Sequence, residues 1–407
     1  MSDPQRIVII GTGLAGATAA GALRERGYSG QLTLLGEEAR RPYELPALSK
    51  GILLGETNDP DWVHDEAFYQ ERDIDLRLST VVSGVRLADR EVVEADGTAH
   101  PFDRLLLATG SAPRRLEVPG AELAGLRTLR SLDDALGLRE ELSEGRRVVI
   151  VGGGWIGCEV AAAARAHGAE VTVVDPLPLP LHRVLGDVVA GVYRDVHAAH
   201  GVNWRLGVGV TAFLGEGAVS GVALADGSEL PADVVLVAVG AAPRVELAAA
   251  MGLELAYPGG VAVDEELRTS APDVYAIGDI AAQVHPRYRN RVRVEHWANA
   301  KDQGAHVAGN LLGGHEPYRA SPYFFSDQYD LGMEFRGLAD PAVDTLVVRG
   351  DLAAREFIAF WLRDGVVRAA MNVNMWDDGD ALGKLVDGDT TVDSAGLVAG
   401  DLASMMG

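Results

Sequence analysis

Two glycine-rich segments of related sequence stand far apart in the chain. Residues 6–16 read RIVIIGTGLAG and residues 147–157 read RVVIVGGGWIG, so each has a β-branched apolar run followed by G-x-G-x-x-G. An Ala-rich stretch and a second apolar run follow each loop and lead to an acid, Glu37 or Asp175. In such a strand–turn–helix the first glycine permits the tight turn, the second lets backbone approach a pyrophosphate, and the third lets helix and strand pack closely. The acids would hold ribose hydroxyls, so the pattern predicts two dinucleotide sites.

A glycine-rich turn without a ligand is the plainer interpretation of either segment alone. Two copies that are complete with strand, helix and terminal acid favour binding instead. At the second loop, Asp175 is followed by Pro176 and Leu177, with no adjacent arginine to accept a 2′-phosphate. This favours NADH over NADPH, while Arg183, further along the chain, leaves the strictness of that preference open.

The elements that must position these loops are two βαβ units, which predict an α/β fold with parallel sheets. Three further apolar runs close on glycine: LLLATG at residues 105–110, VVLVAVG at 234–240 and VYAIGD at 274–279. The last run places Asp279 just beyond a strand, at the carboxyl edge where open α/β sheets bind ligands. A solvated loop aspartate is the alternative for this residue. After about residue 320 the apolar runs alternate in a β-like manner, which predicts a separate α+β domain.

Composition bounds the function classes. The 407 residues have room for two or three domains, and 47% hydrophobic with 23% charged residues is a globular composition. The net charge of −23 repels polyphosphate backbones and anionic lipid, so neither nucleic acid nor a membrane is expected as a partner. The apolar run near the N-terminus is cut by glycines and fits neither a signal peptide nor a membrane span.

The cysteine count is one, at Cys158. It excludes an intramolecular disulfide, a Cys-rich zinc site and a dithiol redox centre, and it predicts a reducing, cytoplasmic location. No metal site is expected. Cys158 follows Gly157 at a helix start, where a thiolate would be stabilised, but a small residue is needed there for packing. We therefore interpret it as structural.

Taken together, these residues resemble the FAD-dependent, NADH-dependent ferredoxin reductases of bacterial oxygenase systems, which include putidaredoxin and rubredoxin reductases. The shared stretches span nearly the whole chain and read VIIGTGLAGATAA, PYELPALSK, LLATGSAPR, RSLDDA, VVIVGGGWIGCEVAAAA, VYAIGDIA, VEHWANA and SDQYD. The resemblance implies two Rossmann-like dinucleotide-binding domains in a glutathione-reductase-like architecture, plus a C-terminal α+β interface domain. Its boundaries would be 1–112 with 240–319 for FAD, 113–239 for NAD, and 320–407 for the C-terminal domain.

The resemblance also implies individual cofactor contacts. The first loop would face the FAD pyrophosphate, Glu37 the adenosine ribose and Asp279 the ribityl chain, while residues 295–297 would wrap the isoalloxazine ring. The implied FAD contacts are Gly11, Gly13, Leu14, Ala15, Gly16, Glu37, Lys50, Val82, Ala108, Thr109, Gly110, Arg130, Gly278, Asp279, Glu295, His296 and Trp297. The implied NADH contacts are Gly152, Gly154, Ile156, Gly157, Asp175, Arg183 and Gly240.

Lys50 and Glu159 match the family's pair beside the reactive nitrogen of the flavin, and are the expected catalytic residues. Lysine is rare in this chain, with Lys50, Lys301 and Lys384 against 33 arginines, which suggests that a compact ammonium is wanted at position 50. Beside a flavin an ammonium would favour the anionic reduced state, and Glu159 would keep it positioned. The alternatives are a surface lysine and a solvated helix glutamate.

The implied activity is hydride transfer from NADH to FAD, followed by single-electron transfer to a ferredoxin, expected to be of the 2Fe–2S type, that feeds an oxygenase. Disulfide reductases and single-cysteine peroxidases place a cysteine before the lysine, where PYELPALSK has none, so the electrons need an external acceptor. An NADH oxidase or peroxide-reducing flavoenzyme is the first alternative. A redox-responsive interaction flavoprotein similar to apoptosis-inducing factors is the second.

The partner surface is expected beside Trp297. Four arginines in PRYRNRVR, just before VEHW, would attract an acidic ferredoxin, although an exposed basic loop without a role is the alternative; they are Arg287, Arg289, Arg291 and Arg293. The sequence departs from the family at Leu45 and Ala47, where arginine and proline are more usual, and at Phe325, where tryptophan usually precedes SDQYD. The chain is expected to be a monomer or a homodimer.

Overall fold

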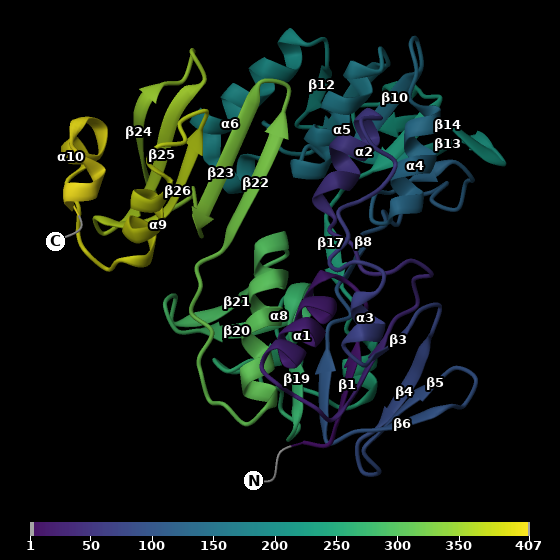
Figure 1. Cartoon of the computed structure of the whole chain (residues 1–407). Coiled ribbons are helices and arrows are strands. Elements are labelled where there is room, and N and C mark those ends of the chain that lie inside the picture. The colour runs from purple at the N-terminus through teal and green to yellow at the C-terminus, as the bar shows by residue number, and fades with distance from the viewer. Residues whose placement is uncertain (1–3, 406–407) are drawn as a thin grey trace. The chain divides into compact units, whose positions relative to one another are not determined.

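The computed structural model of the chain describes residues 4–405 (Figure 1). Its contacts divide it into two compact units, which are described separately below. The first unit comprises Met1–Glu44, Asp61–Ala112 and Ala242–Pro322. The second comprises Leu45–Pro60, Pro113–Ala241 and Tyr323–Gly407. The boundaries of the three predicted domains stay a prediction.

A five-stranded parallel sheet forms the centre of the first unit, in the order β19-β7-β1-β2-β3. These strands are β1 (Arg6–Ile10), β2 (Gln31–Leu35), β3 (Ile74–Arg77), β7 (Arg104–Leu107) and β19 (Val274–Ala276). Residues 7–10 of β1 are all buried, as expected for a parallel strand covered on both faces. The strand order reverses at β1, so the chain leaves β1 and β7 on either side of a topological switch point.

Helices and two small sheets complete the first unit. The helices are α1 (Leu14–Glu25), α3 (Phe68–Glu71), α7 (Glu246–Ala250), α8 (Trp297–Leu311) and the 3₁₀ turn η2 (Gly278–Ile280). The small sheets contain β4 (Val82–Arg86), β5 (Glu91–Glu94) and β6 (Ala99–Pro101), and β18 (Val261–Val263), β20 (Ala281–His285) and β21 (Asn290–Arg293). Helices α1 and α8 pack closely, because a Cβ at Gly304 would lie only 2.6 Å from the Ala15 carbonyl oxygen.

The second unit contains its own five-stranded parallel sheet, in the order β12-β11-β10-β16-β9. The strands are β9 (Leu126–Arg127), β10 (Arg147–Val151), β11 (Glu170–Asp175), β12 (Asn203–Leu206) and β16 (Val234–Val237). A three-stranded antiparallel sheet of β13 (Val210–Glu216), β14 (Ala218–Leu224) and β15 (Glu229–Pro231) packs against it. The helices of this part are η1 (Pro46–Ser49), α2 (Gly51–Leu54), α4 (Leu132–Glu141), α5 (Trp155–Ala166) and α6 (His182–Ala199).

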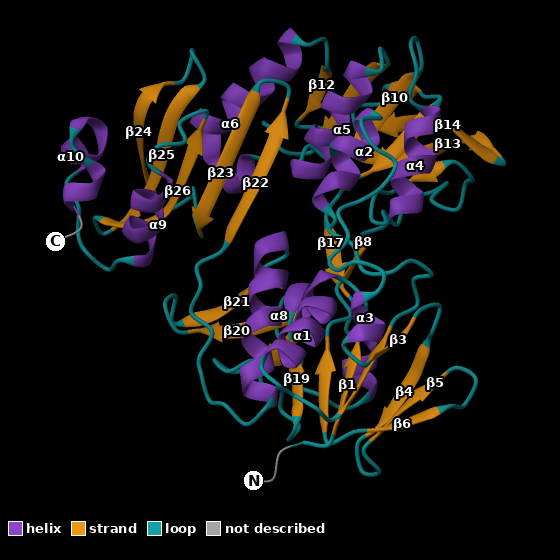
Figure 2. Ribbon diagram, viewed as in Figure 1, coloured by secondary structure: helices purple, strands orange, loops and turns teal. Residues whose placement is uncertain are grey.

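An antiparallel sheet in the order β22-β23-β26-β25-β24 forms the rest of the second unit (Figure 2). Its strands are β22 (Tyr323–Gln328), β23 (Leu331–Gly337), β24 (Thr345–Asp351), β25 (Glu356–Arg363) and β26 (Val366–Val373). Alternation along β25 builds two cores: Phe357 and Trp361 join the cluster that contains α6, whereas Ile358 and Phe360 join the cluster that contains α9 (Gly379–Asp387) and α10 (Ser394–Ala399). The turn η3 (Leu402–Met405) closes the second cluster.

Two short strands, β8 (Ser111–Pro113) and β17 (Ala241–Pro243), pair with each other where the chain passes from one unit to the other. The predicted α/β class with two parallel Rossmann-like sheets and a C-terminal α+β part is confirmed. Within residues 4–405, the structure has no helix that combines the length and apolarity needed to cross a bilayer.

Candidate functional site

The first glycine loop connects β1 to α1. Gly11 has φ +119°, and a Cβ there would lie 2.1 Å from the Ala108 carbonyl oxygen, so only glycine fits. A Cβ at Gly16 would lie 2.0 Å from the Gly11 oxygen, which explains the close approach of helix and loop. At Gly13, the N-cap of α1, no heavy atom of the described residues lies within 4 Å of a Cβ position. The N-cap of α1 therefore has open space beside it and no side-chain cap, which leaves room for an anion at the helix start.

The ends of the neighbouring strands meet this loop. Ala108 follows β7, and Gly278 follows β19. Gly278 has φ +70°, and a Cβ there would lie 3.2 Å from the Ala15 Cβ. Thr109 Oγ1 donates to the Arg244 carbonyl oxygen at 2.8 Å. The structure thus brings together the predicted FAD contacts from the first loop, residues 108–110 and Gly278.

Glu37 lies two residues beyond β2, is exposed, and forms an ion pair with Arg244 (Nη1–Oε1 2.5 Å). The backbone N–H of Arg244 donates to the Gly110 oxygen. The sequence analysis missed Arg244. A signal was present, because Arg244 closely follows the apolar run at 234–240 that closes on glycine. Its guanidinium pairs with Oε1 of Glu37, and the contact of Glu37 with a ribose stays a prediction.

Further predicted flavin contacts of the first unit lie in η2, in β4 and in the segment that precedes α8. Glu295 is exposed and pairs with Arg293, while Asp279 lies in η2 and its carbonyl oxygen accepts from Arg293 Nη1 at 3.0 Å. His296 is the N-cap of α8; part of its residue surface is exposed, yet desolvation of the ring lowers its pKa to about 4. It is neutral at pH 7 and has no imidazolium to offer. Val82 begins β4 and is half-buried.

Trp297 has a fixed indole orientation. Its Nε1–H donates to Glu44 Oε2 at 2.8 Å, and Lys301 Nζ lies 4.8 Å from the ring centroid and 3.8 Å from Glu44 Oε1. The sequence singled out Trp297 but not its partners: Glu44 comes from a segment far away in the chain, and Lys301 lies one turn further along α8. A carboxylate and a cation together hold the ring that the resemblance places near the partner surface.

The second glycine loop repeats the first between β10 and α5. Gly152 has φ +110°, and a Cβ there would lie 2.3 Å from the Ala238 oxygen. A Cβ at Gly157 would lie 2.0 Å from the Gly152 oxygen, and no heavy atom of the described chain lies within 4 Å of a Cβ position at Gly154, the N-cap of α5. Ile156, in the first turn of α5, is 43% exposed. This loop has the same cradle, within the second unit.

Asp175 ends β11 but is buried, with 9% exposure. Its Oδ2 accepts the Gly153 N–H at 2.7 Å and its Oδ1 accepts the Leu177 N–H at 2.8 Å. The carboxylate therefore shapes the loop, in addition to the predicted ribose contact, which stays a prediction. Arg183 is exposed on α6, and Gly240, with φ +104°, is exposed at the boundary between the units.

Lys50 and Glu159 meet in the second unit. Lys50 Nζ lies 2.9 Å from Glu159 Oε1, which confirms that the two side chains form a pair. Glu159 is only 5% exposed, so it is not a solvated helix residue, and Lys50 is half-buried. Two hydroxyls also donate to the carboxylate: Ser49 to Oε2, and Ser326 to Oε1 at 2.6 Å. Three donors around one buried carboxylate hold it in a fixed orientation.

Phe325 stands close to this pair. Its ring centroid lies 5.3 Å from Lys50 Nζ, within the range of a cation–π contact. The residue that departs from the family pattern therefore contacts the lysine of the expected catalytic pair. Arg130, the other predicted FAD contact of the second unit, is half-buried, and its N–H donates to Asp134 Oδ2 at the start of α4. The roles of these residues toward FAD stay predictions.

Cys158 is fully buried in α5, and burial raises the pKa of its thiol. Its Sγ lies 3.7 Å from the Gly153 oxygen. A thiol without solvent access and without a thiolate fraction is not a redox nucleophile, which supports the structural interpretation. Among residues 4–405 there is no cluster of three or more His, Cys, Asp and Glu side chains that could hold a metal ion.

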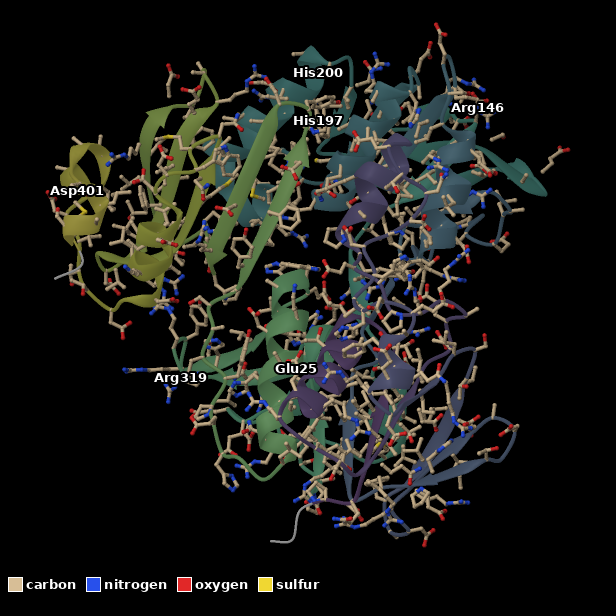
Figure 3. All side chains as sticks on the ribbon, viewed as in Figure 1. Glu25, Arg146, His197, His200, Arg319 and Asp401 are labelled. Atoms are coloured by element: carbon tan, nitrogen blue, oxygen red, sulfur yellow. The ribbon has the colours of Figure 1, made fainter. Side chains whose placement is uncertain are left out.

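The four arginines before VEHW lie on the β20–β21 hairpin of the first unit and differ in environment. Arg291 donates to the carbonyl oxygens of Val263 and Ala282, at 2.9 and 2.5 Å, and Arg293 pairs with Glu295. Arg289, at the turn with φ +53°, is exposed. Arg319, which the sequence analysis did not include, is also exposed (Figure 3). It lies near the hairpin, because the carbonyl oxygen of the adjacent Ala320 is 3.1 Å from His285 Nε2 of β20. Arg287 is half-buried, with its guanidinium 5.8 Å from the centroid of the Tyr288 ring. The hairpin is therefore a basic surface on which Arg287, Arg291 and Arg293 have internal partners.

Both loops fit a dinucleotide. Each has two glycines that no other residue can replace, and an open space in front of a helix N-terminus that lacks a side-chain cap within the described residues. The arrangement can hold two pyrophosphates, one in each unit. The half-buried Lys50, held by the buried Glu159, adds a positive charge that a bound cofactor could use.

Comparison with known proteins agrees with this geometry. The model of the pyridine nucleotide-disulphide oxidoreductase family matches residues 5–304, and the reductase C-terminal family matches residues 323–405. Rhodocoxin reductase of Rhodococcus erythropolis is 40% identical over 359 residues, which cover 87% of this chain and 83% of the relative. The ferredoxin–NAD(+) reductase component of the anthranilate 1,2-dioxygenase system of Burkholderia cepacia is 38% identical, with 95% and 94% coverage.

The solved structures give the same result. The putidaredoxin reductase chain from its covalent complex with putidaredoxin superposes with a TM-score of 0.94 at 35% identity, covering 98% of each chain. The matched region includes both glycine loops and the C-terminal sheet. This chain therefore belongs to the pyridine nucleotide-disulphide oxidoreductase family and, within it, to the ferredoxin–NAD(+) reductases of bacterial oxygenase systems.

Proposed function

We propose that this chain is an FAD-dependent reductase that takes a hydride from NADH and passes single electrons to a 2Fe–2S ferredoxin serving an oxygenase. The observation that carries the proposal is the pair of matched glycine cradles, one in each unit, in a chain whose relatives include a ferredoxin–NAD(+) reductase component. When bound, FAD supplies the conversion between two-electron and one-electron chemistry. The protein supplies binding, orientation and charge.

At the loops, the N-termini of α1 and α5 bind the two pyrophosphates through their backbone N–H groups. Glu37 holds one ribose and Asp175 the other. Asp175 also fixes Gly153, so loop shape and ribose recognition depend on the same carboxylate. No group needs to remove a proton when a hydride is delivered, which agrees with the lowered pKa of His296.

Lys50 and Glu159 are proposed to act beside the flavin. The ammonium favours negative charge on the reduced ring, and Glu159 holds the ammonium in place through a 2.9 Å contact. Because Glu159 is held by two hydroxyls as well, the charge of Lys50 keeps a defined position. Orientation of this kind lowers the reorganisation needed at the moment of transfer.

The ferredoxin is proposed to dock on the β20–β21 hairpin and beside Trp297. Arg289 and Arg319 supply exposed positive charge on a protein of net charge −23, so they would steer an acidic partner to this surface. Arg291 and Arg293, which have internal partners, stiffen the hairpin instead. The three-domain division and the cytoplasmic location remain part of this proposal.

Anaerobic stopped-flow absorbance tests the proposal. The holoprotein is mixed with NADH or NADPH and then with a 2Fe–2S ferredoxin or a rubredoxin. The absorbance of the flavin band at about 450 nm is followed. We expect rapid bleaching that prefers NADH, followed by transfer to the ferredoxin. Absence of bleaching overturns the reductase assignment, whereas bleaching with oxygen as the better acceptor favours an NADH oxidase.

Docking is tested by charge reversal. Arg289→Glu is expected to lower kcat/KM for ferredoxin about 5-fold at low salt, with less effect at high salt, and to leave NADH reduction of the flavin unchanged. Arg115→Glu, an exposed arginine of the second unit, is the matched control. Equal effects of the two variants would place docking elsewhere.

A further inference from the structure

The SDQYD segment at the end of β22 is the shared motif to which the proposed function gives no role. Ser326 and Gln328 are each 1% exposed, whereas Asp327 between them is exposed. Tyr329 follows with φ +56°, and its ring stacks on His200 at a centroid distance of 3.7 Å. His197, on the last turn of α6 (Figure 3), packs edge-on against the Tyr329 ring. The motif is thus anchored on the end of α6, within the second unit.

A single chain of hydrogen bonds runs from α6 through this motif to Glu159. His197 Nε2 lies 2.8 Å from Gln328 Oε1, Gln328 Nε2 donates to Ser326 Oγ at 3.0 Å, and Ser326 Oγ lies 2.6 Å from Glu159 Oε1. An amide oxygen can only accept, so His197 must carry its proton on Nε2. Every donor in the chain then points toward the carboxylate, which accepts only. The direction of each bond is fixed by its neighbours.

This chain is buried along its whole length. His197 is 0% exposed and Glu159 is 5% exposed. Burying four polar side chains destabilises a core unless their polar atoms are paired. Apolar side chains would pack at the same positions with a smaller cost in free energy. The arrangement therefore points to a requirement at its one charged end, Glu159, rather than to stability.

We propose that Ser326 is a positioning residue for Glu159, and that Gln328 and His197 hold the Ser326 hydroxyl in that role. The inference rests on the proposed role of Lys50 and Glu159. Ser326 and Lys50 share Oε1 of the carboxylate, while Ser49 takes Oε2. Without Ser326, the carboxylate can rotate toward Ser49, and the Lys50 ammonium loses its fixed distance.

The test is a double-mutant cycle on the holoprotein. Flavin reduction by saturating NADH is measured anaerobically for wild type, Glu159→Gln, Ser326→Ala and the double variant. We expect reduction to slow at least about 10-fold in Glu159→Gln and about 3- to 5-fold in Ser326→Ala. The double variant should be no slower than Glu159→Gln, because Ser326 acts only through Glu159.

A second readout separates positioning from a general loss of structure. The midpoint potential of the bound flavin should shift in the same direction in Ser326→Ala and Glu159→Gln, since both disturb the Lys50 charge. Gln328→Met, which leaves the Ser326 hydroxyl free to bond Glu159 but less constrained, should give a smaller shift. Ser220→Ala, on β14 with its hydroxyl near the Leu214 oxygen, is the matched control and should change neither rate nor potential.

The outcomes distinguish this inference from the proposed function. If Glu159→Gln reduces at the wild-type rate, the proposed role of the pair is wrong, and the positioning role is overturned with it. If Glu159→Gln is slow but Ser326→Ala matches Ser220→Ala in rate and potential, only the positioning role is overturned. Independent, multiplicative losses in the double variant overturn it as well, because Ser326 would then act by another route.

Discussion

The two glycine loops have the same backbone but use their acids differently. In both, the first glycine abuts a strand-end carbonyl and the middle glycine faces open space at a helix N-terminus. In the first loop, Glu37 is exposed and paired with Arg244. In the second, Asp175 is buried and bonds the N–H groups of Gly153 and Leu177. One acid lies at the surface beside an arginine, and the other is buried and holds the backbone of its loop.

This difference shows that similar sequence copies need not have equivalent parts. In the first copy Thr12 packs against Gly36, because a Cβ at Gly36 would lie 2.0 Å from Thr12 Oγ1. Gly153 takes the position of Thr12 in the second copy and leaves room for the Asp175 carboxylate. The first loop is therefore shaped by packing, and the second by a buried charge.

The largest expected effect comes from the middle glycines. Gly13→Ala and Gly154→Ala each place a methyl group in open space, so each should lower the free energy of unfolding by at most about 1 kcal/mol. If each space holds a pyrophosphate, Gly13→Ala lowers FAD affinity about 100-fold, and Gly154→Ala retains FAD but weakens NADH binding similarly. Flavin content and the NADH dependence of bleaching measure the two effects.

Dithionite provides the control for this pair, because it reduces bound flavin without NADH. Gly154→Ala should bleach normally with dithionite and poorly with NADH. Loss of flavin from Gly154→Ala, with retention in Gly13→Ala, would reverse the assignment of the two loops.

The acids give the next largest effect. In Asp175→Asn the amide can accept one backbone N–H, but its NH₂ group faces the other, so the free energy of unfolding should fall by about 2 kcal/mol. NADH affinity should fall about 10-fold as the loop shifts. Glu37→Gln, exposed and paired with one arginine, should change stability by less than about 0.5 kcal/mol. Urea unfolding and NADH titration of both variants make the comparison.

Equal stability losses in the two variants would contradict the contrast drawn between the loops. An Asp175→Asn variant with full stability and weak NADH binding would show that Asp175 serves the ribose alone.

The sequence predicted the two loops, both parallel sheets and the contact between Lys50 and Glu159, because glycine spacing, β-branched runs and family motifs are local signals. It did not predict Arg244, Glu44 or Ser49 as partners of site residues, since these contacts depend on side-chain packing between distant segments. The burial of Asp175 was missed for a related reason: the terminal acid of a βαβ unit reads the same whether it faces a ribose or the loop. The internal partners of the hairpin residues Arg287, Arg291 and Arg293 are likewise visible only in the fold.

Acid stability extends the comparison from the loops to the two units, since each contains a histidine whose pKa is lowered to about 4. Burial is the main cause for His197 in the second unit, where the hydrogen bond to Gln328 opposes it, and for His296 in the first. The unfolded chain takes up protons below about 6.5, so stability is complete above that pH and is lost as the pH falls toward 4. Each histidine should lower the free energy of unfolding by about 1 kcal/mol between pH 7 and 5.5.

Urea unfolding at a series of pH values measures this loss. His197→Phe, which keeps a ring beside Tyr329, should lose its share of the pH dependence while remaining less stable than wild type at pH 7. An unchanged slope between pH 7 and 5.5 would mean that His197 is not kept neutral by burial.

The smallest expected effect concerns Arg244, for which the second loop has no counterpart. Arg244→Gln removes the guanidinium from Glu37 but keeps the backbone contacts of residue 244 with Thr109 and Gly110. The pair is about half-exposed, so its loss should weaken FAD binding only about 2-fold at low salt and not at all near 1 M salt. The substitution should not change NADH affinity, because Arg244 pairs with Glu37 of the first loop, whereas Asp175 of the second loop is held by backbone N–H groups. A loss of FAD affinity that persists at high salt would instead show that Arg244 contacts FAD itself, and the first loop would then also depend on a charge of its own.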